Sequence, residues 1–302
     1  DALVVATGAR PRTLPGSEGV GGVHVLRTLD DCRALAAATA GPDTRVVVVG
    51  AGFIGAEVAA TCHGRGLAVT VVEALPVPLA GALGEAMGAA CGALHERNGV
   101  RLRTGVGVAG LETTGEGGQR RVSAVELADG STEPADVVLV GIGVTPVTDW
   151  LEGSGLEVRN GVVTDAQLFA ADSVVVAGDA ARWCDPDGTE HRFEHWTNAA
   201  EQGPHAARSL LAGRGGAHAY LPVPYFWSDQ YDVKIQMLGE PRPDDDVAVV
   251  DGSVEEGRFV AIYGRSGRLT AALGFGRPRQ LMGYRALLEA GAGFGEARAH
   301  TP

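Results

Sequence analysis

Short β-branched runs alternate along the chain with stretches that end in glycine, and this alternation predicts an α/β protein. The run 45–49 ends in four consecutive valines, which is typical of a strand buried on both faces of a parallel sheet. Residues 53–65 have apolar positions at helical spacing and end in glycines, which predicts a helix. A second strand over 69–72 closes on Glu73, so this segment forms a complete strand–helix–strand unit.

The rest of the chain contains further segments of both kinds. Strands are predicted at 2–6, 100–104, 106–112, 120–128, 137–140, 162–164 and 173–179, and helices at 83–97 and 197–211. From about residue 222 the pattern changes to short strands at 232–238, 247–250, 258–263 and 269–274, with helices near 278–290. This change predicts a separate small α+β domain at the C-terminal end.

The segment that joins the first strand to its helix is rich in glycine. It has the form G-x-G-x-x-G, with glycines at 50, 52 and 55 and with Phe53 and Ile54 before the last of them. Gly50 permits a tight turn, Gly52 lets backbone N–H groups approach a pyrophosphate, and Gly55 lets the helix pack closely on the strand. Because the motif follows a buried strand and opens a helix, we expect a nucleotide site here; a structural glycine turn is the alternative.

Three further features bear on this site. The Glu73 carboxylate is expected to accept hydrogen bonds from the adenosine ribose and to repel a 2′-phosphate, which favours NADH over NADPH. Gly141-Ile142-Gly143 ends the strand at 137–140 and offers a ledge without side chains for a nicotinamide, or else a plain turn. Glu57, inside the helix, is interpreted equally well as an exposed helix residue or as a contact on the nicotinamide side.

Composition excludes several classes of protein. The net charge of −12 and the absence of a clustered basic face argue against a nucleic-acid partner. The four cysteines stand far apart without a C-x-x-C pair, which predicts no metal site, no local dithiol and a reducing, cytoplasmic setting. No run of about 18 uncharged apolar residues is present, so we expect no membrane span.

The chain opens at Asp1 directly into an apolar run that ends at Thr7 and Gly8. A strand with no earlier strand to pair with predicts that an N-terminal part of the protein precedes this chain.

Several motifs in order along the chain carry a resemblance to a known family. They are A-T-G-A-R-P-R at 6–12, G-A-G-F-I-G-A-E at 50–57, V-G-I-G-V-T-P at 140–146, A-G-D at 177–179, H-W-T-N-A-A-E-Q-G at 195–203 and Y-F-W-S-D-Q-Y-D at 225–232. Together they resemble the FAD-dependent, NADH-oxidising ferredoxin and rubredoxin reductases of cytochrome P450 and Rieske oxygenase systems, within the pyridine nucleotide-disulfide oxidoreductase superfamily. The F-W-S-D-Q run is the most specific of these motifs.

The resemblance implies two Rossmann-like dinucleotide-binding domains and a small C-terminal α+β domain. The FAD-binding domain is expected to be incomplete and the NAD-binding domain complete. The implied boundaries are 1–13 for the remnant of the FAD domain, 14–145 for the NAD domain, 146–216 for the second part of the FAD domain and 220–302 for the C-terminal reductase domain.

The resemblance also implies flavin contacts near the start of the chain and in its middle. Thr7 and Gly8 correspond to the A-T-G turn near FAD, and Arg10 to the arginine that follows it. Asp179 corresponds to the aspartate that holds the ribityl chain, a role that suits a carboxylate accepting from sugar hydroxyls.

Further flavin contacts are implied by the two later motifs. Trp196, Asn198 and Gln202 correspond to the segment that leads into the helix on the pyrimidine side of the flavin. Trp227 corresponds to the aromatic residue at the exposed edge of the isoalloxazine. The alternative for both tryptophans is ordinary core or interface packing.

The activity implied is hydride transfer from NADH to FAD, followed by single-electron transfers to an iron–sulfur protein, ferredoxin or rubredoxin. This chemistry belongs to the cofactors, so no catalytic side chain is assigned. Arg277, Arg279 and Arg285 are candidates for a local basic patch that meets an acidic partner, against the simpler interpretation of solvated surface arginines.

Two other functions stay open at this point. A disulfide reductase of the same fold is disfavoured because no C-x-x-C lies in the NAD domain, although a cysteine pair in a preceding segment is not excluded. A non-catalytic NAD-binding module is the alternative from another class, and the missing FAD unit favours it if the gene itself begins at Asp1.

Overall fold

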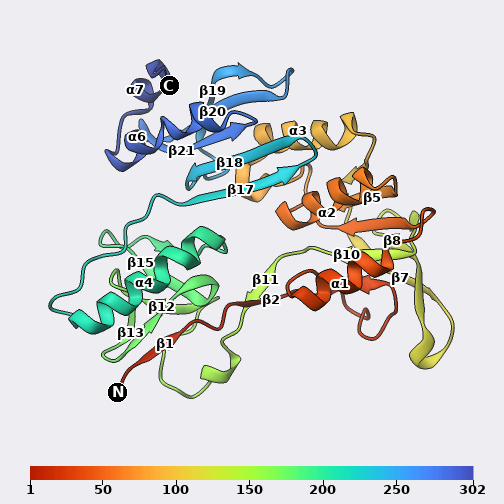
Figure 1. The fold of residues 1–302 in the computed structure, drawn as a ribbon, viewed down its shortest axis with the longest axis horizontal. Coiled ribbons are helices and arrows are strands. Elements are labelled where there is room, and N and C mark those ends of the chain that lie inside the picture. The colour runs from red at the N-terminus through yellow and green to blue at the C-terminus, as the bar shows by residue number, and fades with distance from the viewer. Residues whose placement is uncertain (302) are drawn as a thin grey trace. The chain divides into compact units, whose positions relative to one another are not determined.

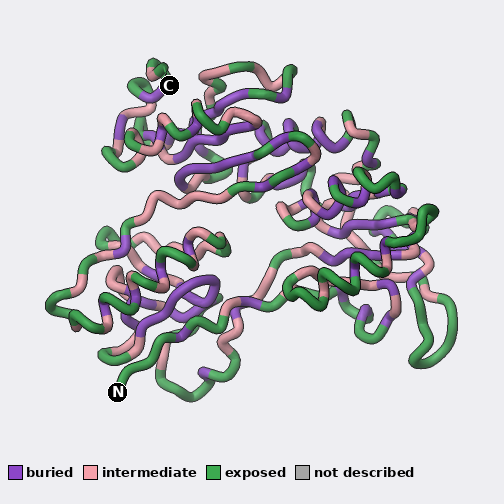
Figure 2. The backbone as a smooth tube through the Cα atoms, in the orientation of Figure 1, coloured by how far each residue is buried: buried purple, intermediate pink, exposed green. Residues whose placement is uncertain are grey.

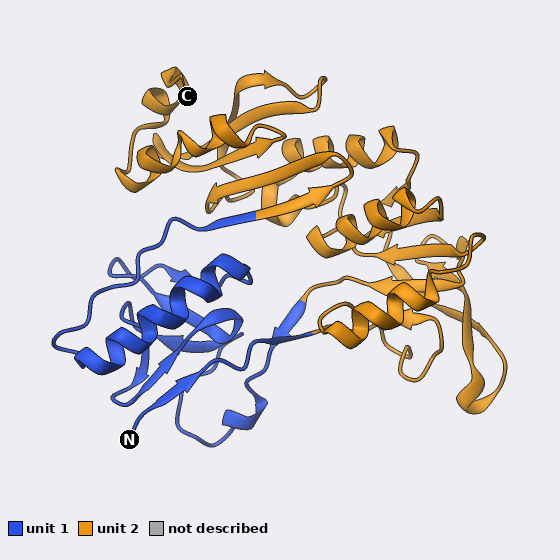
Figure 3. Cartoon of the chain, viewed as in Figure 1, with its two compact units in different colours: residues 1–10, 144–226 blue, residues 11–143, 227–302 orange. Residues whose placement is uncertain are grey.

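A computed structural model describes residues 1–301 of the chain and divides it into two compact units (Figure 3). Residues 1–10 and 144–226 form unit 1, and residues 11–143 form unit 2 together with the described residues from Trp227 onward. Each unit is therefore assembled from segments that lie far apart in the sequence.

Unit 2 contains a five-stranded parallel sheet in the order β3-β10-β4-β5-β6 (Figure 1). The strands are β3 (Val23–His24), β4 (Arg45–Val49), β5 (Ala68–Glu73), β6 (Arg101–Thr104) and β10 (Val137–Val140). The helices of this region are α1 (Leu29–Ala38), α2 (Phe53–Gly64) and α3 (Ala80–Arg97). A three-stranded antiparallel sheet of β7 (Val108–Thr114), β8 (Arg121–Leu127) and β9 (Thr132–Pro134) completes it.

The valines of β4 explain why this strand is apolar on both faces. Val46 and Val48 belong to the core that includes Val58 of α2, whereas Val47 and Val49 belong to the core that includes Val125 of β8. Successive side chains of a strand point to opposite faces, so each layer takes every second valine. The strand buried on both faces that the sequence predicts is thus present.

The C-terminal part of unit 2 is a five-stranded antiparallel sheet in the order β17-β18-β21-β20-β19. Its strands are β17 (Tyr225–Gln230), β18 (Val233–Gly239), β19 (Asp246–Ser253), β20 (Arg258–Arg265) and β21 (Arg268–Phe275), and β17 belongs to unit 2 from Trp227 onward. Three short helices follow, α5 (Pro278–Met282), α6 (Arg285–Glu289) and α7 (Phe294–Ala299). The inner strands β20 and β21 are almost wholly buried (Figure 2), and the rings of Phe259 and Phe275 stack 5.0 Å apart between them.

Unit 1 is built from small sheets and one long helix. In the first sheet, β1 (Leu3–Val5) pairs in parallel with β14 (Val174–Val176), which pairs antiparallel with β13 (Phe169–Ala171). The second sheet joins β12 (Val162–Thr164), β15 (Ala181–Cys184) and β16 (Glu190–His191), while β2 (Ala9–Pro11) pairs with β11 (Val144–Pro146). Helix α4 (Trp196–Ala212) packs on β14.

The predicted element boundaries differ from the structure in two helical regions. The helix predicted at 83–97 begins at Ala80 and has a kink at Gly84, where φ is 74°. The helix signal near 278–290 corresponds to α5 and α6, which are separate helices on either side of Gly283. Among residues 1–301, no helix is long and apolar enough to cross a membrane.

Candidate functional site

The turn after β4 has a backbone that only glycine can adopt. Gly50 has a φ of 97°, and a Cβ at this position would lie 2.4 Å from the carbonyl oxygen of Gly141. Its amide donates to Val72 O at 2.8 Å, which joins the turn to β5. Any side chain at residue 50 would therefore move the end of β10 away from the end of β4.

The next two glycines of the motif differ in what surrounds them. A Cβ at Gly55 would lie 2.1 Å from Gly50 O and 3.1 Å from Val48 Cγ1, so α2 packs directly on the strand and its turn. A Cβ at Gly52 would meet no atom closer than Gly141 O at 3.9 Å. Gly52 is the N-cap of α2, and no side chain caps the helix there. Open space before an uncapped helix N-terminus is the arrangement that binds an anion such as a pyrophosphate.

Glu73 is the last residue of β5, and its carboxylate is bonded to the glycine loop. Oε2 accepts from Ala51 N at 2.7 Å, and Oε1 accepts from Leu75 N at 2.9 Å. A carboxylate has about four acceptor positions, so roughly two remain for hydroxyl groups of a ligand. The structure therefore places an oriented acceptor beside the turn that the motif forms.

Gly141, Ile142 and Gly143 follow β10 and lie against the same turn. Gly141 N donates to Val49 O at 2.7 Å, and a Cβ at Gly143 would meet nothing within 4 Å. Phe53 and Ile142 are half-buried and Ile54 is 42% exposed. All nine residues predicted to contact NAD thus lie in unit 2, at the carboxyl ends of three adjacent strands.

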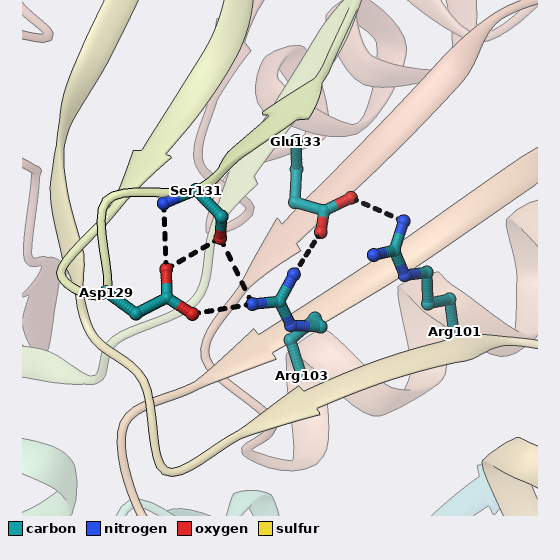
Figure 4. A network of polar contacts seen from close by, with 5 residues as sticks. All are labelled: Arg101, Arg103, Asp129, Ser131 and Glu133. Carbon is teal, nitrogen blue, oxygen red and sulfur yellow. Dashed lines mark hydrogen bonds and ion pairs between the residues drawn. The ribbon is translucent and has the colours of Figure 1, made fainter.

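A polar network links β6 to the hairpin formed by β8 and β9 (Figure 4). Arg103 of β6 is opposite Val72 in the register, and it donates to Glu133 Oε1 at 2.6 Å and to Asp129 Oδ2 at 2.8 Å. Glu133, whose side chain is only 3% exposed, also pairs with Arg101 at 3.0 Å. The guanidinium groups of both β6 arginines are therefore paired with carboxylates of this hairpin.

In unit 1, the residues near the start of the chain are held by the segment after β11. Thr7 Oγ1 donates to Val147 O at 2.6 Å, and Val147 N donates to Gly8 O at 2.9 Å. Arg10 forms an exposed ion pair with Asp149 at 2.5 Å. The A-T-G-A-R motif is thus fixed to the second segment of the same unit.

The A-G-D turn at 177–179 rests on buried amide side chains of α4. Gln202 is fully buried, and its Oε1 accepts from Gly178 N at 2.8 Å and from Asn198 Nδ2 at 3.4 Å. Asn198 Oδ1 in turn accepts from Tyr220 Oη at 3.2 Å. These bonds fix the turn that carries Asp179, which is 7% exposed. Asn198 and Gln202 therefore support this turn, a role that the sequence did not indicate.

Unit 1 fits a ligand that carries acceptor oxygens. Gln202 Nε2 is buried and has no partner among the described residues, although a buried amide N–H normally has one. Helix α4 also begins at His195 without a side-chain cap. An orphaned donor and an uncapped helix N-terminus fit the carbonyl and hydroxyl oxygens of a flavin nucleotide.

The two tryptophans assigned to the flavin are exposed. Trp196, the first residue of α4, is 74% exposed, and Trp227 on β17 is 41% exposed. Neither is therefore an ordinary core residue. Trp196 belongs to unit 1 and Trp227 to unit 2, so the residues assigned to FAD are distributed over both units.

The three C-terminal arginines have different partners. Arg277 pairs with Asp251 at 3.3 Å, and Arg285 pairs with Glu289 at 3.1 Å. Arg279 is exposed on α5 and has no ion pair among the described residues. Two of the three candidate charges are thus neutralised within their own domain.

Sequence reasoning missed the polar contacts that join residues 228–231 to the helices α2 and α3. Ser228 donates to Glu57 of α2 at 2.7 Å, and Tyr231 Oη bonds His95 Nδ1 of α3 at 2.7 Å. The only available signal was the alternation of β17, in which Ser228 and Gln230 fall on one face. Nothing in the sequence indicated which helix that face meets.

The fold and this geometry define a dinucleotide-binding α/β protein with an added antiparallel C-terminal domain. The family of pyridine nucleotide-disulphide oxidoreductases matches residues 1–203, and a reductase C-terminal domain matches residues 225–302. The chain belongs to the pyridine nucleotide-disulphide oxidoreductase family. The α/β fold class and the family predicted from the motifs are both confirmed.

The curated relatives are reductases, and some of them are named as components of dioxygenase systems. Rhodocoxin reductase of Rhodococcus erythropolis is 39% identical over 292 residues, which cover 95% of this chain and 66% of that protein. The ferredoxin–NAD(+) reductase component of the anthranilate 1,2-dioxygenase system of Burkholderia cepacia is 38% identical, with 96% and 70% covered. The chain spans about two thirds of the length of such relatives.

A solved structure shows the same likeness. The reductase in the covalent putidaredoxin reductase–putidaredoxin complex superimposes with a TM-score of 0.89 at 32% identity, over 96% of this chain and 70% of that chain.

Proposed function

We propose that this chain is the larger part of a flavoprotein that passes electrons from NADH through FAD to a small iron–sulfur protein, a ferredoxin or rubredoxin of an oxygenase system. The observation that carries the proposal is 39% identity to a rhodocoxin reductase over 95% of this chain, including the C-terminal reductase domain. The putidaredoxin reductase–putidaredoxin complex supports an iron–sulfur protein as the partner.

NADH is the proposed donor because of the residues around the glycine loop. Backbone N–H groups at the start of α2 would hold the pyrophosphate, and Gly52 leaves room for it. Glu73 would accept from the ribose hydroxyls, and it would repel a 2′-phosphate. Gly141, Ile142 and Gly143 would line the path of the nicotinamide half.

FAD is the second proposed cofactor, and it would be held by the eight residues that the family resemblance assigns. They are Thr7, Gly8, Arg10, Asp179, Trp196, Asn198, Gln202 and Trp227. When bound, a flavin supplies the conversion of a two-electron donor into single electrons for the acceptor. The chain's own residues bind and orient the cofactors, and no side chain is assigned to move a proton.

A disulfide reductase is the weaker candidate. All four cysteines are free, and burial raises the pKa of the Cys91 thiol to about 12 and also raises that of Cys62. Protonated, buried thiols are poor nucleophiles. Free cysteines also support the proposal that the protein works in the reducing cytoplasm.

Anaerobic rapid mixing of the flavin-loaded holoprotein with NADH tests the proposed function. Loss of the oxidised flavin absorbance, followed by its return when a small ferredoxin is added, is the expected result. A holoprotein that binds NADH but never transfers electrons would favour the non-catalytic NAD-binding module. Transfer to a disulfide substrate in preference to the ferredoxin would favour a disulfide reductase.

A further inference from the structure

Strand β17 has two different faces. Trp227 and Asp229 are exposed, whereas Ser228 and Gln230 are fully buried. This alternation is the period of a strand, and β17 lies at one edge of its sheet. Its buried polar face therefore requires hydrogen-bond partners of its own.

The partner of this face is a carboxylate on the nucleotide helix. Ser228 Oγ donates its only proton to Glu57 Oε1 at 2.7 Å, and Asp229 N donates to the same oxygen at 3.3 Å. Gln230 Nε2 donates to Ser228 Oγ at 3.2 Å, which orients the hydroxyl. Two donors of β17 thus converge on one side-chain oxygen of α2, and this contact joins the strand to the helix.

Glu57 lies close to the start of α2, one turn after Phe53, the first residue of the helix. The same segment of chain also reaches the other end of α2, because the ring of Tyr231 lies 6.0 Å from that of His63 in the last turn of the helix. Residues 228–231 thus contact α2 near both of its ends. A shift of α2 along its axis would therefore strain the bond between Glu57 and Ser228.

We infer that Ser228 is a positioning residue for the dinucleotide site: through Glu57 it couples the occupancy of the glycine loop to the order of β17. The inference rests on the proposed function, in which the pyrophosphate is bound at the N-terminus of α2. A ligand at that terminus restrains the helix, and the Glu57–Ser228 bond extends the restraint to β17. Coupling between two sites is reciprocal, so breaking the bond also weakens dinucleotide binding.

Hydrogen exchange and calorimetry on the holoprotein, with NAD+ as the probe, test this coupling. In the wild type, NAD+ slows amide exchange in residues 227–230. Ser228→Ala abolishes this slowing and weakens NAD+ binding about fivefold, at the lower end of typical coupling between sites. Ser228→Thr, which keeps the hydroxyl, restores both.

Thr270→Val is the matched control. Thr270 lies in the same sheet, on β21, and its hydroxyl donates to Asp245 Oδ2 at 2.8 Å. This substitution removes a hydroxyl–carboxylate bond of the same kind that has no link to α2. It therefore leaves the NAD+ affinity and the exchange in β17 unchanged.

Two results would overturn the inference. In the first, Ser228→Ala lowers the melting temperature but leaves the NAD+ affinity and the slowed exchange of residues 227–230 as in the wild type. The bond would then only hold the C-terminal sheet on α2. If Ser228→Ala does not fold, Glu57→Ala removes the same bond from the α2 side, where the residue is half-buried. Its NAD+ affinity and its amide exchange are then measured by the same calorimetry and hydrogen-exchange experiments. A wild-type protein that binds no NAD+ would overturn the proposed function, and this inference with it.

Discussion

The glycine loop of unit 2 and the A-G-D turn of unit 1 both support a candidate nucleotide site, but they are built in opposite ways. The loop depends on the absence of side chains, because a Cβ at Gly55 would lie 2.1 Å from Gly50 O. The A-G-D turn depends on the presence of a side chain, because the buried Gln202 Oε1 accepts a hydrogen bond from Gly178 N. The glycine loop therefore tolerates no added side-chain atom at Gly55. At the A-G-D turn, a substitution of Gln202 removes one hydrogen bond but adds no steric clash.

The largest effect is expected when a methyl group is added in the loop. Gly55→Ala forces α2 away from β4, and overpacking of this kind costs about 1–3 kcal/mol or more. We expect a lower melting temperature and loss of measurable NADH binding by calorimetry. Gly64→Ala is the matched control, since Gly64 ends the same helix and a Cβ there meets nothing within 4 Å. Equal damage from both substitutions would refute the steric argument.

The next effect is acid sensitivity in unit 2. Burial lowers the pKa of His95 from 6.5 to about 4, while its Nδ1 bonds Tyr231 Oη. Below pH 6.5, His95 takes up a proton in the unfolded chain but not in the folded chain. The free energy of unfolding is therefore fully retained above pH 6.5 and declines as the pH falls towards 4. The loss is at most about 3 kcal/mol for one such group.

Denaturant melts of the wild type and of His95→Gln between pH 7.5 and pH 4 check this effect, since the interval runs from about one unit above the pKa in the unfolded chain to the pKa in the folded chain. The variant is expected to show a smaller decline in unfolding free energy over this interval. Parallel declines for both proteins would assign the acid sensitivity to another group. Hydrogen exchange at pH 5 should locate the early loosening in α3 and in residues 228–231.

In unit 1, removal of the supporting amide is expected to have an intermediate effect. Gln202→Ala leaves Gly178 N without its partner, and an unsatisfied buried donor costs about 1–3 kcal/mol. We expect weaker retention of FAD during dialysis, with NADH affinity unchanged because the glycine loop lies in the other unit. Gln202→Glu keeps an acceptor oxygen at the same reach and is expected to retain more flavin than the alanine variant. Normal flavin retention by Gln202→Ala would mean that the turn is held by its backbone alone.

A smaller effect is expected at the adenosine end of the loop. Glu73→Ala removes an oriented acceptor together with its bond to Ala51 N, and a typical hydrogen bond contributes about 0.5–1.5 kcal/mol. NADH affinity is expected to fall about tenfold, and the preference for NADH over NADPH to shrink. Titrations with both nucleotides measure this. An unchanged ratio of the two affinities would remove Glu73 from coenzyme selection.

The same contrast explains how much the sequence could predict. Where close backbone contacts require glycine, the required residues lie near one another in the sequence and form a recognisable motif. The motif therefore predicted both the turn and the close packing of α2. The role of Gln202 depends on a turn 24 residues away, and that of Ser228 on a helix 171 residues away. Tertiary contacts at such separations have no local signal. The kink at Gly84 was missed for a related reason, because an isolated glycine in a helical pattern is often tolerated.

The smallest effect is expected at the C-terminal arginines, where charge acts at a distance. Arg279→Glu reverses the charge of an arginine that has no ion pair among the described residues. Arg285, in contrast, is paired with Glu289. If an acidic iron–sulfur protein docks near α5, reversal slows its association a few-fold at low salt, and added salt reduces the difference because exposed charges are screened. Arg285→Glu is the control and is expected to change the rate less, since its charge is already balanced. Stopped-flow reduction of the ferredoxin at two ionic strengths measures the rates of both variants and of the wild type. Equal rates for the three proteins, independent of salt, would place the docking surface elsewhere.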